Sequence, residues 1–140
     1  MRISTRGRYG LKVVVDIAKH IGRSARCVSL KSSAERLGIS ENYLEQIVAS
    51  LKKAGILKSV RGAGGGYYLS RVPEEITVGE ILRILEGNLA PTDCATGNED
   101  NCGEGDCGTC SSKTVWRAIF ENVNQVVDSV TIADLLSADE

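Results

Sequence analysis

The sequence predicts a mainly α-helical fold with a small β-hairpin wing, namely a winged helix-turn-helix followed by a long C-terminal dimerisation helix. Three observations predict it. Apolar residues recur at helical spacing in the first half, a tight glycine-containing turn joins two short helical segments, and a glycine-rich run separates two strand-like segments. With 140 residues and 42% hydrophobic content, the chain can bury one core and carry an appendage for dimerisation.

Three helices are predicted first. Residues 4–20 form an amphipathic helix with basic residues near its start. Ser29 can cap a second, short helix that ends at Gly38, a residue suited to a left-handed C-cap. A third helix follows at 41–54, and two short helices joined by so tight a turn are typical of a helix-turn-helix. The outward face of the third helix offers hydrogen-bonding and charged groups to base edges and phosphates: Asn42, Glu45, Gln46, Ala49, Ser50, Lys52 and Lys53.

A β-hairpin is predicted after the third helix. Residues 56–61 and 67–70 have the composition of strands, and the glycine-rich run 62–66 is a flexible turn between them. A glycine-rich loop can also cradle a nucleotide, but that use requires a helix N-terminus directly after the glycines, and here an aromatic strand follows. The hairpin is therefore interpreted as the wing of a winged helix. Arg61 at its base could enter a narrow minor groove, whose negative potential attracts arginine.

Further helices are predicted in the second half. Thr77 and Glu80 form a capping box that opens a helix closed by Gly87. A long helix begins after Ser112, and a short final helix covers 131–136. The long helix carries a broad apolar stripe that is either core or a dimer interface, and the helix-turn-helix upstream favours the dimer. The stripe comprises Val115, Trp116, Ile119, Phe120, Val123, Val126 and Val127.

The predicted organisation has four segments. These are a winged helix-turn-helix DNA-binding domain at 1–72, a connecting helix at 73–93, a cysteine loop at 94–110, and the dimerisation helix with a short C-terminal helix at 111–140.

Charge is divided sharply between the two halves. Residues 1–71 hold fourteen Lys and Arg against four Asp and Glu, a net charge of +10, whereas residues 72–140 have a net charge of −11. A basic half of this strength suggests a polyanion partner, most commonly nucleic acid. Neither a membrane span nor a secretory signal is apparent, so the expected location is cytoplasmic. His20 is the only histidine and no catalytic set can be assembled around it, so an enzyme is not expected.

Four cysteines lie in an acidic, glycine-rich run with the spacing C-x7-C-x4-C-x2-C: Cys94, Cys102, Cys107 and Cys110. The run has little apolar surface to bury, so thiolate ligation of a metal centre would supply ordering energy. A structural zinc site is the second interpretation, because only Cys107 and Cys110 form a tight C-x2-C pair. A thiol–disulfide switch through that pair is the third. Cys27, far upstream, is predicted to be a packed residue.

Several motifs together resemble the bacterial winged-helix iron–sulfur regulators that include IscR and NsrR. The resemblance is carried by residues 1–10, 39–47 and 60–67, and extends through the cysteine loop to 131–135. It implies a homodimeric transcription regulator, a repressor at some promoters, that binds palindromic operator DNA and holds an iron–sulfur cluster beside a dimerisation helix. Control of cluster-biogenesis genes is favoured. Repression in response to nitric oxide, redox state or iron is the alternative within the family, and a zinc-stabilised DNA-binding protein is the alternative outside it.

The resemblance also implies site residues. Cys94, Cys102 and Cys107 match three cysteine ligands of the IscR pattern, whereas Cys110 stands where that pattern has a histidine. A 2Fe–2S cluster is favoured and a 4Fe–4S cluster is the alternative, since four thiolates suit both. Residues expected to contact bases or lie beside them are Ser40, Asn42, Tyr43, Glu45 and Gln46, with Arg61 in the minor groove and Arg2, Arg6 and Arg8 on phosphates.

Overall fold

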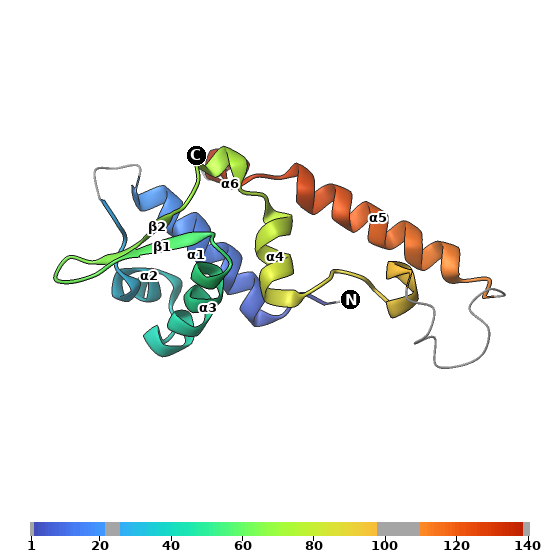
Figure 1. The fold of residues 1–140 in the computed structure, drawn as a ribbon, viewed down its shortest axis with the longest axis horizontal. Coiled ribbons are helices and arrows are strands. Elements are labelled where there is room, and N and C mark those ends of the chain that lie inside the picture. The colour runs from blue at the N-terminus through green and yellow to red at the C-terminus, as the bar shows by residue number, and fades with distance from the viewer. Residues whose placement is uncertain (1, 22–25, 98–109, 139–140) are drawn as a thin grey trace.

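The computed structural model describes residues 2–21, 26–97 and 110–138. A winged-helix unit forms one end of the molecule, and a long helix extends from it to the other end (Figure 1). The elements in chain order are α1 (Thr5–Ile21), α2 (Leu30–Leu37), α3 (Glu41–Lys53), β1 (Leu57–Val60), β2 (Gly66–Leu69), the 3-10 helix η1 (Pro73–Glu75), α4 (Val78–Glu86), the 3-10 helix η2 (Asp93–Thr96), α5 (Lys113–Ser129) and α6 (Ile132–Ala138). The predicted fold class is confirmed, because these elements include one two-stranded antiparallel hairpin and are otherwise helical.

The turn between α2 and α3 forms as the sequence predicts. Ser29 adopts an extended conformation and its side chain accepts a hydrogen bond from the Ser32 backbone N–H. Gly38 ends α2 in the left-handed region at φ 69°, which glycine adopts without a steric penalty. Ser40 then caps α3 by accepting from the Tyr43 N–H at 3.2 Å. Gly38 and Ser40 therefore fix the two helix ends that meet at the turn, and Ser29 fixes the other end of α2.

The wing is a tight hairpin that also binds the segment before α2. Its register pairs Leu57 with Leu69 and Val60 with Gly66. Val28 adds an isolated bridge to Tyr67, with hydrogen bonds of 2.9 and 2.8 Å. The backbone of Val28 comes so close to Gly66 that a Cβ at Gly66 would overlap it, so glycine is required at this position.

The main core is built around α1. Its buried face carries Val13, Val14 and Ile17, which pack with Leu44 and Val48 of α3 in one cluster. The C-terminal part of the chain enters the same core, since Ile76, Ile81 and Ile132 belong to this cluster: α6 packs on α1, and its first residue donates from its backbone N–H to the Ile76 carbonyl at 2.9 Å. The two ends of the described chain therefore stabilise each other.

Helix α4 packs on both α1 and α5. Val78 and Leu82 of α4 form a second apolar cluster with Leu89, against which Val123 and Val127 of α5 pack. Arg83 crosses the same interface and forms an ion pair with Asp128, with two hydrogen bonds of 2.7 and 2.8 Å, and it donates a third to Asn124 at 2.8 Å. This pair is exposed, so its Coulombic contribution is small and apolar packing holds the interface.

Helix α5 has no buried residue over its 17 positions. The apolar stripe that the sequence predicts is divided. Val123 and Val127 lie against α4, while the side chains of Val115 and Val126 are 53% and 61% exposed. A helix with this much apolar surface is unusual unless a further surface covers it.

We expect Ile132→Ala to lower the free energy of unfolding by about 3 kcal/mol, because it would leave a cavity at the point where α6 enters the core. Urea denaturation followed by circular dichroism would measure this. Leu135→Ala is the matched control, because Leu135 lies on the same helix and is only half-buried. Equal losses for the two variants would contradict the placement of α6.

Candidate nucleic-acid interface and metal centre

Helix α3 presents a polar face opposite its buried face. Leu44, Ile47, Val48 and Leu51 are at most 1% exposed, so the remaining sides of the helix face outward. On this exposed surface lie Asn42, Glu45, Gln46, Ala49, Lys52 and Lys53. An exposed helix face with amide, carboxylate and ammonium groups has the donors and acceptors needed to contact base edges and phosphates.

Tyr43 differs from its neighbours on α3. It is half-buried, and its ring lies edge-on to that of Tyr9, with centroids 6.4 Å apart and planes at 88°. The Lys12 ammonium lies over the Tyr9 ring at 5.1 Å from its centroid. The ring of Tyr43 therefore packs the start of α3 against α1.

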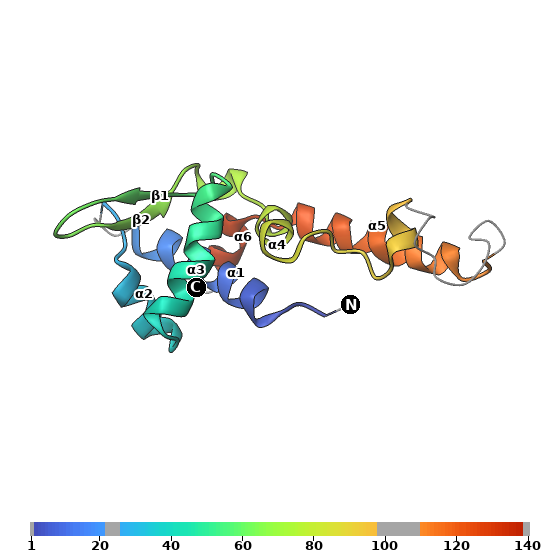
Figure 2. The ribbon, with the colours of Figure 1, turned by 60° about the horizontal axis from the view of Figure 1, so that its bottom comes forward.

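The basic N-terminal segment lies beside α3. Arg2, Arg6 and Arg8 are exposed, and the Arg6 guanidinium donates to the Ser50 hydroxyl on α3. Figure 2 shows α3 across the front of α1, with the hairpin extending to one side and the N-terminal segment to the other. Arg61 is exposed at the end of β1, where the wing turns. The polar residues singled out in the sequence thus lie on α3, and the arginines lie on the N-terminal segment, on α1 and at the wing.

Cys27 contacts the turn of the wing. It is half-buried, and its thiol donates to the Gly64 carbonyl at 3.2 Å. The prediction that Cys27 is a packed residue is consistent with this position.

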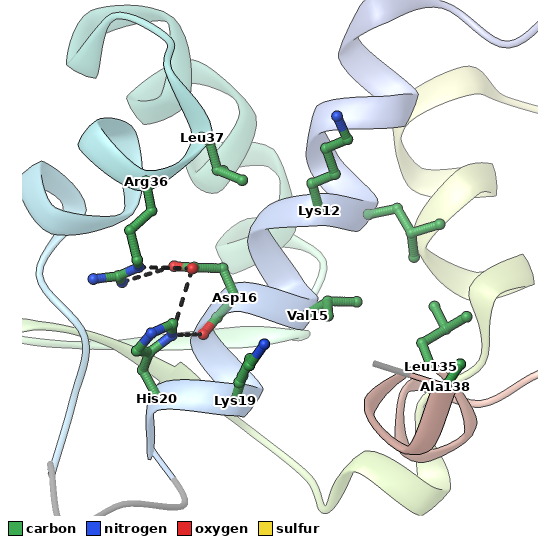
Figure 3. Close-up of a pocket in the computed structure, with 10 residues that line it drawn as sticks. Lys12, Val15, Asp16, Lys19, His20, Arg36, Leu37, Leu135 and Ala138 are labelled. Atoms are coloured by element: carbon green, nitrogen blue, oxygen red, sulfur yellow. Dashed lines mark hydrogen bonds and ion pairs between the residues drawn. The ribbon is translucent and has the colours of Figure 1, made fainter. Parts of the chain in front are cut away.

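One polar group in the winged helix was not anticipated from the sequence. Asp16 of α1 is 9% exposed and accepts hydrogen bonds from Ser33 at 2.7 Å and from Arg36 at 2.8 Å to each carboxyl oxygen. His20 lies 3.4 Å from the same carboxyl (Figure 3). The group borders a hollow of about 570 Å³ between α1, α2 and α6. The sequence does carry a signal for this group, because Asp16 is the single acidic residue within the otherwise apolar run 13–18.

The Asp16 carboxyl is charged at neutral pH. Burial raises its pKa, but hydrogen bonds from Arg36 and Ser33 and the positive charge of Arg36 outweigh burial, so the pKa lies below its usual value. The same interaction raises the pKa of Arg36. Because Asp16 lies on α1 and both donors lie on α2, the cluster fixes the first helix of the helix-turn-helix to the core.

Two of the four candidate metal ligands, Cys94 and Cys110, lie in the described part of the chain. Cys94 is in η2, which packs on the N-terminal half of α5 (Figure 1). Its thiol is buried and lies 3.1 Å from the Thr92 hydroxyl. Cys110 is exposed and precedes α5 by three residues. Cys102 and Cys107 lie outside the described residues. The expectation of a run without packing is therefore wrong for its first residues, because Cys94 and Ala95 are buried.

The two described cysteines fit a thiolate-bound centre. Hydrogen bonds from the Ser112 side chain and backbone lower the pKa of Cys110, with smaller contributions from Lys113, and a lower pKa favours the thiolate that binds metal. Cys94 belongs to the element that packs on α5, and Cys110 lies three residues before α5 begins, so both ends of the cysteine run adjoin this helix. Within the ranges 2–21, 26–97 and 110–138, no three candidate ligands come together.

Comparison with known proteins decides the family. A family model described as "Rrf2: Iron-dependent Transcriptional regulator" matches residues 3–138. The chain belongs to the Rrf2 family. The HTH-type transcriptional regulator CymR of Bacillus subtilis is 42% identical over 137 residues, which cover 98% of this chain and 91% of CymR. IscR of Sodalis glossinidius is 34% identical over 140 residues, covering 100% of this chain and 81% of that protein.

Solved structures agree with this Rrf2 assignment. The structure of CymR, the global cysteine regulator of B. subtilis, superposes with a TM-score of 0.81 at 40% identity, covering 99% of this chain and 98% of CymR. IscR of T. potens gives a TM-score of 0.79 at 44% identity and covers 100% of this chain and 89% of its own. The Rrf2 relatives are transcriptional regulators and not enzymes, as the sequence predicts. In the described part of the chain, no helix is long and apolar enough to cross a membrane.

We expect Asp16→Asn to lower the free energy of unfolding at neutral pH by about 2 kcal/mol, because Arg36 and Ser33 would lose their charged acceptor. Since folding depresses the pKa of Asp16, its contribution is complete above the unfolded-state pKa of about 3.9 and is lost as pH falls through the lower folded-state value.

The difference between wild type and Asp16→Asn should therefore shrink below about pH 4. Urea denaturation at a series of pH values would measure it, with Glu35→Gln on the exposed side of α2 as the control. A difference that stays constant down to the lowest pH would contradict the role of the charge.

Proposed function

We propose that this Rrf2-family regulator binds palindromic operator DNA as a homodimer and that an iron–sulfur cluster held by Cys94, Cys102, Cys107 and Cys110 controls this binding. The observation that carries the proposal is the placement of Cys94 and Cys110. Both ends of the cysteine run adjoin α5: Cys94 is buried in η2, which packs on this helix, and Cys110 lies three residues before it. Control of cluster-biogenesis genes is the favoured role, with the 2Fe–2S type as the favoured cluster.

The proposed DNA contacts follow from exposure and position. Asn42, Glu45 and Gln46 face outward from α3, so they would read base edges, with Ser40 and Tyr43 beside them. Arg61 at the turn of the wing would enter the minor groove. Arg2, Arg6 and Arg8 would bind phosphates.

The proposed dimer uses α5. Its exposed Val115 and Val126 need a covering surface, and a second copy of the same helix offers one of matching character. Two-fold symmetry would then place the two α3 helices on half-sites about one DNA turn, roughly 34 Å, or a multiple of it apart.

The proposed control depends on how the ligands hold the chain. When bound, the cluster would supply a redox-sensitive link among four thiolates. Ligation of Cys94 and Cys110 would fix η2 to the start of α5. Since α5 also packs on α4, a change at η2 can reach the winged helix. The cluster must change the free energy of operator binding by the same amount as operator DNA changes the free energy of cluster binding, because a coupling free energy is reciprocal.

A second candidate role has support from the comparisons. CymR is named a global cysteine regulator, and it covers 98% of this chain at 42% identity. A cysteine-regulator role is therefore the alternative. The four clustered cysteines favour the cluster-sensing role, and metal analysis separates the two.

Protein purified without oxygen should be coloured and contain iron and sulfide. Cys110→Ala should lose most of the iron, because one thiolate ligand is removed, whereas Cys27→Ala should retain it, because Cys27 contacts the wing instead. Absorbance, metal and sulfide assays would show this. Operator affinity should differ between the loaded protein and Cys110→Ala.

Colourless protein with stoichiometric zinc would contradict the iron–sulfur cluster and favour a structural zinc site at the same cysteines. Colourless protein without metal would favour the cysteine-regulator role. Equal operator affinity of loaded and cluster-free protein across several operators would rule out cluster control.

Replacing Glu45 with alanine should relax sequence preference more than it weakens binding. A carboxylate near DNA is repelled unless it accepts from a cytosine amino group, so its main effect is discrimination. In-vitro selection followed by affinity measurement on matched and mismatched duplexes would test this. Glu41→Ala, also exposed on α3, is the control. A uniform change across all duplexes would contradict the assignment.

A further inference from the structure

The N-terminus of α1 is held by a carboxylate from α4. Ser4 caps α1, since its hydroxyl accepts from the Gly7 N–H at 3.2 Å and its carbonyl accepts from the Arg8 N–H at 3.1 Å. The backbone N–H of Ser4 donates to Glu86 Oε1 at 3.0 Å, and the Ser4 hydroxyl donates to the same oxygen. One carboxylate therefore fixes the residue that caps α1 from a site 82 positions away in the sequence.

Glycine on α1 makes this contact possible. A Cβ added at Gly7 would overlap Glu86 Oε1, and one added at Gly10 would overlap Leu85 Cδ1. The end of α4 thus lies directly on the first turns of α1. Gly7 adjoins the carboxylate, whereas Gly10 adjoins only an apolar neighbour.

Glu86 is also the last residue of α4, before the connection that leads to Cys94. A hollow of about 260 Å³ adjoins it, lined by Arg2, Ile3, Glu86, Asn88, Leu89, Ala90 and Val123. Three parts of the chain therefore meet beside Glu86: the basic N-terminal segment, the connection to η2, and α5.

The negative charge of Glu86, considered apart from its contact with Ser4, opposes DNA binding. It lies beside a segment whose exposed residues include Arg2, Arg6 and Arg8, and a carboxylate facing a polyanion is repelled. Removing this charge should strengthen DNA binding if Glu86 is only a surface residue. A positioning role predicts the opposite for any change that breaks the contact.

We propose that Glu86 is a positioning residue for DNA binding: by holding Ser4, it sets the path of the arginine-bearing N-terminal segment and links that segment to the connection before Cys94. This rests on the proposed phosphate contacts of Arg2, Arg6 and Arg8. It adds a route within one chain from the ligand end of the molecule to the DNA-binding end.

Two variants separate the contact from the charge. Gly7→Ala keeps the carboxylate but displaces its flexible end from Ser4, and alanine is a better helix former than glycine. Glu86→Gln removes the charge but keeps an acceptor oxygen for Ser4. Gly10→Ala is the packing control, because it perturbs the same helix pair without touching Glu86.

The measurement is the affinity for a mixed-sequence DNA duplex as a function of salt concentration. Gly7→Ala should bind about tenfold more weakly than wild type, with a salt slope smaller by about 1 to 2, because one or two phosphate contacts are lost. Glu86→Gln should bind at least as tightly as wild type. Gly10→Ala should keep the wild-type slope.

Glu86→Ala provides a second test should Gly7→Ala unfold. It lacks both the charge and the contact, so it should bind more weakly than Glu86→Gln. Equal binding by these two variants, or a wild-type slope for a folded Gly7→Ala, would overturn the positioning role alone. Wild-type protein that binds no duplex would overturn the proposed function and this role together.

Discussion

The structure depends on the close packing of α4 between α1 and α5. Gly7 and Gly10 admit the C-terminal end of α4 onto α1, and on the opposite side a Cβ at Gly79 would overlap Asp128 of α5. Close approach at both faces allows nine residues of α4 to join the winged helix to a helix that has no buried residue of its own. Larger side chains would separate the helices and lose the dispersion contacts that hold them.

The division of charge acquires a structural meaning from this arrangement. The basic first half forms the winged helix, whereas α4, η2 and α5 come from the acidic second half. Where the halves meet, acidic groups of the second half find partners: Glu86 accepts from Ser4, and Glu80 accepts from Arg71 at 3.1 Å. The remaining basic groups beside α3 stay exposed, so the positive field is concentrated on the surface proposed to bind DNA.

Local signals in the sequence predict much of the fold. Ser29, Gly38 and the Thr77–Glu80 capping box each act within a few residues, so their effect can be read directly, and the helix ends lie where predicted. Contacts between distant residues could not be predicted in this way. The partners of Asp16, the pairing of Ser4 with Glu86, and the return of Ile132 to the core depend on tertiary packing. Of the candidate site, the exposed face of α3 followed from helical spacing, but the burial of Cys94 did not, because η2 is stabilised by α5.

Distance between the two candidate sites constrains any control of DNA binding. The element that contains Cys94, η2, and the start of α5, which Cys110 precedes, both lie away from the wing (Figure 1). Within one chain, the connection from η2 to α4 reaches Leu89, which is 6% exposed and packs with Val78 and Leu82, and then Glu86 beside the start of α1. Because Leu89 is buried, a displacement of η2 must either move α4 or be absorbed between residues 90 and 92. Buried apolar contacts resist a movement of α4, and the short connection limits how much displacement it can absorb. The packing of Leu89 therefore decides how much of any change at the thiolates reaches the face proposed to bind DNA.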